Sequence, residues 1–332
     1  MILITGPVAS GKRTYAEKLG YTVEQMSADV HSDSLVVYDV QEAVRAFLAN
    51  NPDKQAALDE LMPLLLNRDV VITTEVGSGV IPLEYADRLF RETAGRLTNE
   101  LAQHADEVIR MVWGIPQMLK RIMRVTLVRH GKTQGNLEKR YNGSTDEPLC
   151  GEGEECAREA SSRDVFAKCE TPVVFVSPLL RARQTASILY PRARQIVVDG
   201  LQEMDFGDFE GRTACEMIAD DAYIAWVNSG AEDVCPNGES RAIFMDRVIR
   251  AFKSAVTQAC EMDLPECIIV GHGGTIMCVM DALVDSEKSY FEWHVQNCVA
   301  VKARCDMVSW KISDVDIEGG MSDSLMHLAS KR

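Results

Sequence analysis

The sequence lacks several features that would assign it to a common class. No apolar run approaches the ~20 residues that a membrane-spanning helix needs, and the opening apolar stretch is too short for a secretory signal. No cysteine precedes Cys150, and none of the ten cysteines forms a Cys-x-x-Cys pair, so neither a zinc ribbon nor a dithiol redox motif is indicated. We therefore expect a cytoplasmic protein with reduced thiols.

Basic residues are also scarce. The chain has 35 lysines and arginines against 50 aspartates and glutamates, a net charge of −15. Such an excess of negative charge argues against nucleic acid or an anionic membrane as a partner, so any basic site must be local. With 332 residues, and no internal repeat, the chain is expected to hold two domains of roughly 150 residues each. The oligomeric state stays open.

The most informative stretch is residues 124–136, an apolar strand that ends in Arg129, His130 and Gly131. Imidazole is nucleophilic near neutral pH, and a guanidinium can hold two phosphate oxygens at once. A strand that delivers both groups to its end suits attack on a phosphoryl group. An isolated Arg-His-Gly can equally be an ordinary polar loop, so the interpretation depends on further motifs.

Further motifs follow in order along the chain. Residues 172–186 form an apolar strand followed by Ser177 and Arg181, residues 201–211 carry Glu203, and a third strand from residue 267 ends at His272. Together with residues 124–136, which match the pattern R-H-G-x-T-x-x-N, these motifs resemble the histidine phosphatase (phosphoglycerate-mutase-like) superfamily. Within this superfamily, the chain resembles the α-ribazole phosphatases.

This resemblance implies a role for each matched residue. His130 would be the nucleophile that forms a phosphohistidine, while Arg129, Arg181 and His272 neutralise the phosphate oxygens. Glu203 would be the proton donor. The substrate-binding residues carried over are Thr133, Asn136 and Gly273. Such a phosphatase needs no metal and no cofactor.

Some residues near these motifs leave alternatives open. Asp205 and Glu210 are rivals to Glu203 as the proton donor. Residues 236–240 resemble the Gly-Glu-Ser turn of the family, but they can equally be a plain helix cap. His294 and His327 have no motif around them, and we assign both to structure or surface.

The first domain opens with a strand at residues 1–5, a glycine loop of the type G-x-x-x-x-G-K, and a helix. Such a loop presents backbone amides to phosphates. ATP or GTP is the candidate ligand, with or without Mg²⁺, because Arg13 stands where a hydroxyl would ligate the ion. The candidate nucleotide-binding residues, including two carboxylates after later strands, are Gly6, Ser10, Gly11, Lys12, Arg13, Thr14, Asp39 and Glu75.

A second resemblance covers residues 1 to about 120. Residues 73–82, 90–97 and 105–108 resemble the adenosylcobinamide kinase/adenosylcobinamide-phosphate guanylyltransferase family, which assembles the nucleotide loop of cobalamin. The family's Asn-Gln pair is Thr98-Asn99 here, and the segment with its guanylate-carrying histidine is much shortened. His31 is the only histidine before Asp39. We therefore expect a phosphate-binding loop that has lost guanylyl transfer and the kinase step.

The expected fold is α/β with two domains, each a mostly parallel sheet flanked by helices. Residues 1–122 would be P-loop NTPase-like and residues 123–312 phosphoglycerate-mutase-like. Residues 118–123 would be a short junction, and the polar end, 313–332, is expected to be partly disordered. Helices are expected at residues 41–48, 83–105, 152–168, 181–189, 214–228 and 240–262. A further helix is expected after the turn at residues 50–53 and ends near residue 66.

Two function hypotheses follow. In the first, the chain dephosphorylates a small cobalamin precursor, α-ribazole 5′-phosphate or adenosylcobalamin 5′-phosphate, because both resemblances lead to one pathway. In the second, it is a broad-specificity or signalling histidine phosphatase, and its first domain is a nucleotide-sensing or oligomerising module.

Overall fold

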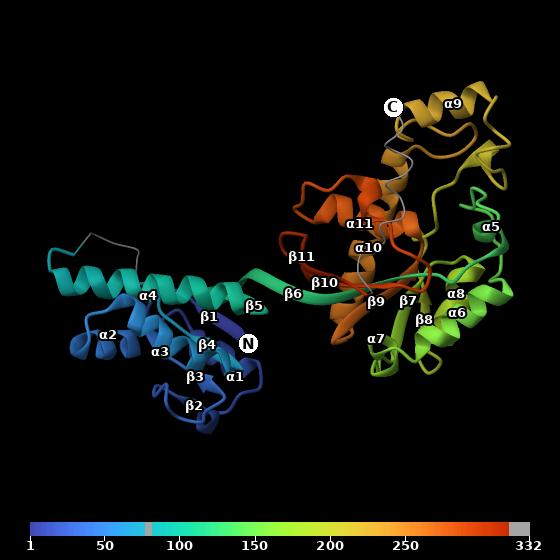
Figure 1. The fold of residues 1–332 in the computed structure, drawn as a ribbon. Coiled ribbons are helices and arrows are strands. Elements are labelled where there is room, and N and C mark those ends of the chain that lie inside the picture. Colours follow the sequence, from blue (N-terminus) through green and yellow to red (C-terminus); the bar gives the residue numbers. More distant parts are fainter. Residues whose placement is uncertain (77–81, 319–332) are drawn as a thin grey trace. The chain divides into compact units, whose positions relative to one another are not determined.

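The computed structural model describes residues 1–76 and 82–318 of the chain (Figure 1). The chain divides into two compact units, Met1–Ile122 (unit 1) and Met123–Arg332 (unit 2). Both have a mostly parallel sheet flanked by helices, which confirms the predicted α/β class. Within the described ranges, no helix has the length and apolar character that crossing a bilayer requires.

Unit 1 is built around a short parallel sheet in the order β2-β3-β4-β1-β5, with the first part of β6 antiparallel to β5 at its edge. The parallel strands are β1 (Ile2–Thr5), β2 (Met26–Ser27), β3 (Val36–Val37), β4 (Val70–Ile72) and β5 (Glu107–Val112), and β6 is Ile115–Arg129. The helices are α1 (Lys12–Lys18), η1 (Val23–Gln25), α2 (Val40–Asn50), α3 (Lys54–Leu66) and α4 (Tyr85–His104).

Alternating residues of these strands supply two cores, because successive side chains point to opposite faces of a sheet. Leu3 and Val71 lie in the core that includes buried residues of α2, α3 and α4, which pack together in Figure 1. Ile4 and Val70, their neighbours in sequence, lie in the other core with Ala16 of α1. The predicted glycine loop after β4 includes residues 77–81, which lie outside the described residues.

Unit 2 has a larger sheet in which the second part of β6 and then β9, β7 and β8 are parallel neighbours. Its other strands are β7 (Val173–Val176), β8 (Arg194–Val197), β9 (Glu266–Gly271), β10 (Ala300–Asp306), which pairs with β6, and β11 (Lys311–Ile317), antiparallel to β10. The helices are α5 (Gln134–Leu137), α6 (Gly151–Ser161), α7 (Asp164–Ala167), α8 (Leu180–Leu189), η2 (Gly207–Phe209), α9 (Asp221–Asn228), α10 (Arg241–Glu261), α11 (Gly273–Leu283) and η3 (Tyr290–Trp293).

The unit 2 sheet is covered on both faces. Leu127 and Ile269 lie in the core that includes α10 and α11, whereas Val128 and Val270 lie in the core that includes α6 and α8. Figure 1 shows each of these helix pairs side by side. Five of the cysteines are buried in this unit: Cys235, Cys267, Cys278, Cys298 and Cys305.

Several predicted elements are corrected. Residues 118–123 do span the boundary between the units, but they belong to the strand β6, because Trp113 and Gly114 adopt positive φ (52° and 78°) and turn the chain back along β5. The helix expected at 152–168 breaks between α6 and α7. The helix expected at 214–228 begins only at Asp221, since the Asp220 carboxylate accepts from Ala222 N and caps it there.

The polar end of the chain is also ordered further than predicted. Residues 313–317 belong to β11, which pairs with β10, and the neighbouring Ile312 is buried. The expectation of disorder from residue 313 is therefore wrong for this strand, and residues 319–332 lie outside the described residues.

Candidate active site

The site lies where neighbouring parallel strands of unit 2 end. β6 ends at Arg129 with His130 next, Ser177 follows β7, and His272 follows β9. Because parallel strands bring their carboxyl ends to one edge of the sheet, these residues meet there. His130 is 4% exposed and His272 is fully buried.

His130 is held in one tautomer. Its Nδ1 lies 2.6 Å from the carbonyl oxygen of Gly131, which can only accept, so Nδ1 carries the proton and Nε2 keeps its lone pair. Burial, and then the charges of Arg181 and Arg129, hold the pKa of His130 well below its ordinary value. The ring is therefore neutral at neutral pH, as a nucleophile must be.

His272 lies edge-on to His130, with ring centroids 5.1 Å apart. Its Nδ1 accepts from Arg181 Nε at 3.3 Å, so Nε2 carries the proton and donates to Ser177 Oγ at 2.7 Å. Burial, followed by the charge of Arg181, lowers the pKa of His272 well below its ordinary value. In this arrangement a neutral His272 orients the Arg181 guanidinium.

Arg181, on α8, is fully buried. Its Nη2 donates to Gly143 O and its Nη1 to Thr145 O, both at 2.7 Å. Burial lowers the pKa of Arg181, and the charge of Glu203 is the strongest influence that opposes it. The guanidinium thus joins His272 to the turn that contains residues 143–145.

Arg129 is held from one side only. Its Nη1 donates to Val295 O at 2.6 Å and to His294 Nε2 at 2.8 Å, whereas its buried Nε has no hydrogen-bond partner among the described residues. A buried donor without a partner is costly, which points to a ligand that supplies an acceptor. A phosphate oxygen fits this requirement.

His294 is a site residue that the sequence analysis missed, since no motif surrounds it. Burial, followed by the positive charge of Arg129, lowers the pKa of His294 to about 4. Its Nε2 can therefore accept from Arg129. Asn297 was missed for the same reason, although its amide donates to His130 O at 2.8 Å.

The Glu203 carboxylate lies against the first turn of α11, the helix that begins directly after His272. Its Oε2 accepts from Gly274 N at 2.9 Å and its Oε1 from Met204 N at 3.0 Å. A Cβ at Gly274 would approach Glu203 Oε1 to 2.1 Å, so only glycine leaves room for the carboxylate. The charge of Glu203 also acts on both Arg129 and Arg181.

The rival carboxylates organise the neighbouring turn. Glu210 accepts from Gly143 N at 3.1 Å and Ser144 N at 2.9 Å. Asp205 Oδ1 accepts from Gly207 N at 2.9 Å and Ser144 Oγ at 3.1 Å. Both side chains are thus committed to loop structure.

The predicted substrate-binding residues lie close by but have local partners. Thr133 caps α5: its hydroxyl accepts from Asn136 N at 3.2 Å, and Asn136 Oδ1 accepts from Thr133 N at 3.1 Å. Gly273 lies against the Arg129 guanidinium, where a Cβ would sit 3.3 Å from Cζ. Gly273 therefore makes room for the arginine.

The glycine loop of unit 1 has its lysine folded inward. Lys12 Nζ donates to Gly6 O at 3.0 Å and to Pro7 O at 2.6 Å. Burial lowers the pKa of Lys12, while the charges of Asp39 and Glu75 oppose this effect, so both carboxylates face the loop. Glu75 also holds Arg110 through bidentate contacts of 2.7 and 3.0 Å, which leaves it committed to that pair.

The loop backbone fits its sequence. Gly6 and Gly11 have positive φ (140° and 87°), and a Cβ at Gly6 would approach Met111 O to 2.4 Å. Ser10 Oγ is buried and has no hydrogen-bond partner within residues 1–76 and 82–318. The remaining predicted residues here are exposed, with the Arg13 guanidinium 4.8 Å from the Tyr38 ring centre and Thr14 beside it.

His31, the histidine that the sequence offers as a guanylate carrier, lies at the surface of unit 1. His31 is exposed and its backbone amide donates to Asp29 at 2.9 Å. Over residues 1–76 and 82–318, no group of three His, Cys, Asp or Glu side chains is placed to hold a metal ion.

Comparisons with known families match both units. The family model for cobinamide kinase / cobinamide phosphate guanyltransferase matches residues 24–119, which begin after the glycine loop. The model for the histidine phosphatase superfamily (branch 1) matches residues 125–317, more than half of the chain.

Several curated proteins are similar to this chain. An adenosylcobalamin/α-ribazole phosphatase of Escherichia coli is 29% identical over 199 residues, which are 58% of this chain and 91% of that protein. A glucosyl-3-phosphoglycerate phosphatase of Mycolicibacterium vanbaalenii is 35% identical over 173 residues, 49% of this chain and 75% of that protein.

A solved structure shares the fold. The crystal structure of a putative α-ribazole-5′-P phosphatase from Escherichia coli matches with a TM-score of 0.52 and 24% identity, over 59% of this chain and 95% of that one. The family model, together with the buried histidines that follow two strands and the arginines beside them, leads to one conclusion: the chain belongs to the histidine phosphatase superfamily, branch 1.

Proposed function

We propose that unit 2 hydrolyses phosphate monoesters through a phosphohistidine at His130. The observation that supports this most directly is the tautomer of His130: Nδ1 donates to Gly131 O, and the lone pair of Nε2 is left for attack. The charges of Arg129 and Arg181 both act on this buried, neutral imidazole.

The reaction has two steps. First, His130 Nε2 forms a bond to phosphorus as the ester P–O bond breaks, and Glu203 gives its proton to the leaving alkoxide. Second, Glu203 takes a proton from water, whose oxygen attacks phosphorus, and the P–N bond breaks to give inorganic phosphate and free His130. Arg129 and Arg181 stabilise the oxygens in both steps.

Glu203 is favoured as the proton donor over its rivals. Its carboxylate accepts a hydrogen bond from Gly274 N, two residues after His272, and its charge acts on both Arg129 and Arg181. Asp205 and Glu210 are occupied by backbone amides and hydroxyls of the turn at residues 143–145.

The proposed substrate is α-ribazole 5′-phosphate or adenosylcobalamin 5′-phosphate. The support is the combination in one chain of a cobinamide kinase / guanyltransferase match and similarity to an adenosylcobalamin/α-ribazole phosphatase. The alternative is a broad-specificity or signalling phosphatase. Its support is a relative of comparable similarity that is named for a sugar phosphoglycerate substrate.

A phosphate-release assay tests this function. We expect the kcat/KM of the full chain for α-ribazole 5′-phosphate to exceed that for phosphoglycerates and sugar phosphates by at least tenfold, on the order of the 1.4 kcal/mol that a few added contacts supply. Similar values for all substrates would favour the alternative.

His130→Ala should abolish both turnover and the acid-labile phosphohistidine, and turnover by this variant would refute the mechanism.

We also propose that unit 1 binds the phosphates of ATP or GTP at residues 6–14 without transferring guanylate. Phosphate binding is supported by the inward Lys12, by the positive φ of Gly6 and Gly11, and by the buried Ser10 hydroxyl, which has no partner in the described part of the chain. Arg13 removes a Mg²⁺ ligand, and the exposed His31 lies in a segment unlike that of the guanylate carriers.

The test uses Trp113, which is the only tryptophan of unit 1 and is 92% exposed. Its neighbour Gly114 donates to Ser10 O of the loop at 3.1 Å. GTP should change the tryptophan emission of the wild type but not of Lys12→Ala, with Trp113→Phe as the control for the reporter. Labelled guanylate retained on the protein, and lost in His31→Ala, would overturn the absence of guanylyl transfer.

A further inference from the structure

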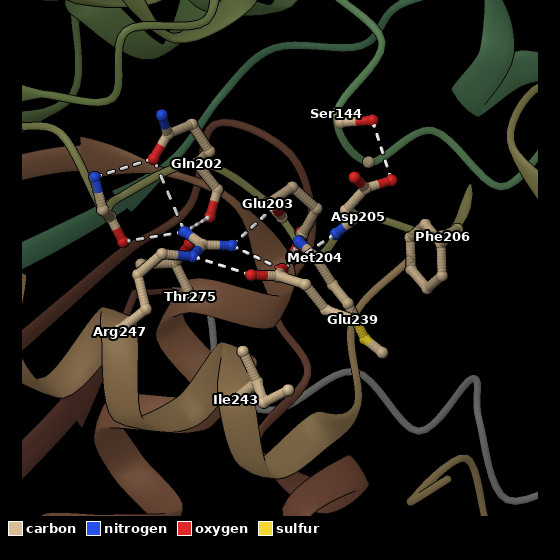
Figure 2. A network of polar contacts seen from close by, with 12 residues as sticks. Ser144, Gln202, Glu203, Met204, Asp205, Phe206, Glu239, Ile243, Arg247 and Thr275 are labelled. Atoms are coloured by element: carbon tan, nitrogen blue, oxygen red, sulfur yellow. Dashed lines mark hydrogen bonds and ion pairs between the residues drawn. The ribbon is translucent and has the colours of Figure 1, made fainter. Parts of the chain in front are cut away.

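An ion pair outside the phosphate site holds the backbone on both sides of Glu203. Arg247, on α10, donates from Nη1 to Gly200 O at 3.0 Å and to Gln202 O at 3.1 Å, and from Nη2 to Glu203 O at 3.3 Å. Figure 2 shows the guanidinium reaching across to this segment. One side chain thus fixes the carbonyls that lead up to Glu203.

Glu239 is the partner of Arg247 in this ion pair. Its carboxylate holds Arg247 in a bidentate pair, Nε to Oε1 at 3.0 Å and Nη2 to Oε2 at 2.7 Å. The same Oε2 accepts from Asp205 N at 3.1 Å, on the far side of Glu203 (Figure 2). With side chains 24% and 19% exposed, this pair is partly withdrawn from water and geometrically well defined.

The Glu203 side chain is fixed independently at the other end. Its carboxylate accepts from Gly274 N at 2.9 Å, at the beginning of α11. The backbone is therefore anchored to α10 through Arg247, and the carboxylate is anchored to α11. Displacing either anchor would move the carboxylate relative to His130, and a misplacement of about 1 Å can cost a rate factor on the order of 10².

We propose that Glu239 and Arg247 are positioning residues for proton transfer by Glu203. They touch neither the phosphate site nor Arg129 and Arg181 in any contact described above. They act by holding residues 200–205 so that the carboxyl group meets the leaving oxygen. This inference rests on the proposed role of Glu203 as the proton donor.

The distinguishing property is the dependence on the leaving group. An alkyl phosphate needs its alkoxide protonated, whereas an aryl phosphate such as p-nitrophenyl phosphate has a leaving group that needs little protonation. General acid help is typically worth 10²–10⁴-fold. The measured quantity is kcat/KM, which reports the steps up to loss of the leaving group and excludes the hydrolysis of the phosphohistidine that both substrates share. Glu239→Gln should lower kcat/KM for the alkyl phosphate by roughly 10-fold or more and for the aryl phosphate by less than about 3-fold. Inhibition by inorganic phosphate should stay unchanged, because both phosphate-binding arginines keep their partners.

The matched control is the ion pair of Arg250 with Asp246 on the same helix, whose nitrogen–oxygen distance is 2.7 Å but whose side chains are 74% and 66% exposed. Arg250→Gln should leave both substrates unaffected. Arg247→Lys retains the charge but not the fork of donors, so it should reproduce the Glu239→Gln pattern. Thermal unfolding of each variant shows whether it is folded.

A double variant decides whether the pair acts through Glu203. In a Glu203→Gln background, Glu239→Gln should cause no further loss, because the proton donor is already absent. Additive losses of kcat/KM, or equal losses of kcat/KM on both substrates in Glu239→Gln, would overturn the inference while leaving the role of Glu203 intact. Equal losses of kcat/KM on both substrates in Glu203→Gln itself would overturn the donor assignment and the inference together.

Discussion

The contact between Arg129 and His294 works in only one protonation state. The arginine can only donate, so His294 Nε2 must keep its lone pair, and the 2.8 Å contact requires a neutral ring. Burial and the arginine charge lower the pKa of His294 to about 4. Protonation of His294 would place two positive charges together inside the protein.

A pH dependence of stability follows. The pKa values of His130, His272 and His294 are all lowered in the folded state, and the unfolded chain has histidine pKa values of about 6.5. Below about pH 6.5 the unfolded state therefore binds more protons, and the stability that is complete above this pH is lost as the pH falls toward 4. We expect the Tm contribution of these histidines to be nearly constant above about pH 7 and to fall as the pH drops from about 6.5 to 5.

His294→Asn isolates one of these groups. An asparagine oxygen can still accept from Arg129 but does not titrate, so the decline in Tm with falling pH should be shallower in this variant. His31→Asn, which removes an exposed histidine of unit 1, is the control. A decline as steep in His294→Asn as in the wild type would contradict the assignment.

At the residue scale, sequence patterns could locate only part of the site. His130, Arg181 and His272 were found because each follows a strand that reads clearly as apolar. His294 was missed because it contacts Arg129 across a long separation in sequence, and no local pattern marks such a contact. Glu239 lay in a turn that could be a helix cap, and Ser240 does cap α10 by accepting from Ile243 N at 3.2 Å.

At the element scale, α6 packs closely against the loop after His130. A Cβ at Gly153 would lie 1.9 Å from Lys132 O, which is backbone and cannot rotate away. We expect Gly153→Ala to destabilise unit 2 by roughly 1–3 kcal/mol, the usual cost of overpacking. It should also reduce phosphatase activity, because the displaced loop begins beside His130.

Gly151 offers a matched control on the same helix. A Cβ there has no atom within 4 Å, so Gly151→Ala should change the free energy of unfolding by no more than about 0.5 kcal/mol. Urea denaturation of both variants gives the comparison. Equal effects would show that the close approach of α6 to Lys132 is not what makes glycine necessary.

The strands that the sequence predicted well are those with a continuous apolar run. The runs beginning near residues 2, 70, 125, 173 and 267 are almost entirely apolar and buried, as expected for a parallel sheet covered on both faces. The first part of β6 was not predicted because Gln117, Lys120 and Arg121 interrupt its apolar residues and its pairing with β5 depends on the turn at Trp113. β11 escaped for a similar reason, since most of its side chains face solvent.

At the scale of the whole molecule, each unit has its own hydrophobic cores. Every residue of the unit 1 cores precedes residue 119, and every residue of the unit 2 cores follows residue 122. We therefore expect calorimetry to show two unfolding transitions. One transition, with equal calorimetric and van't Hoff enthalpies, would contradict this expectation.

Ligands should assign the transitions. Orthovanadate, a phosphate analogue, should raise only the Tm of unit 2, and GTP only that of unit 1, since a ligand stabilises the unit that binds it. Lys12→Ala should abolish the GTP shift and leave phosphatase activity unchanged, because all the phosphatase residues described above follow residue 128. A loss of phosphatase activity in Lys12→Ala would show that the units are coupled.

The distribution of thiols gives each unit a separate chemical signature. All cysteines lie in unit 2, and those that are buried, such as Cys267, have raised pKa values because burial disfavours the thiolate. A thiol reagent therefore reaches them only when unit 2 opens, while unit 1 contributes nothing to the signal. The rate of their labelling measures the opening free energy of the phosphatase unit in the intact chain, without any label having to be introduced.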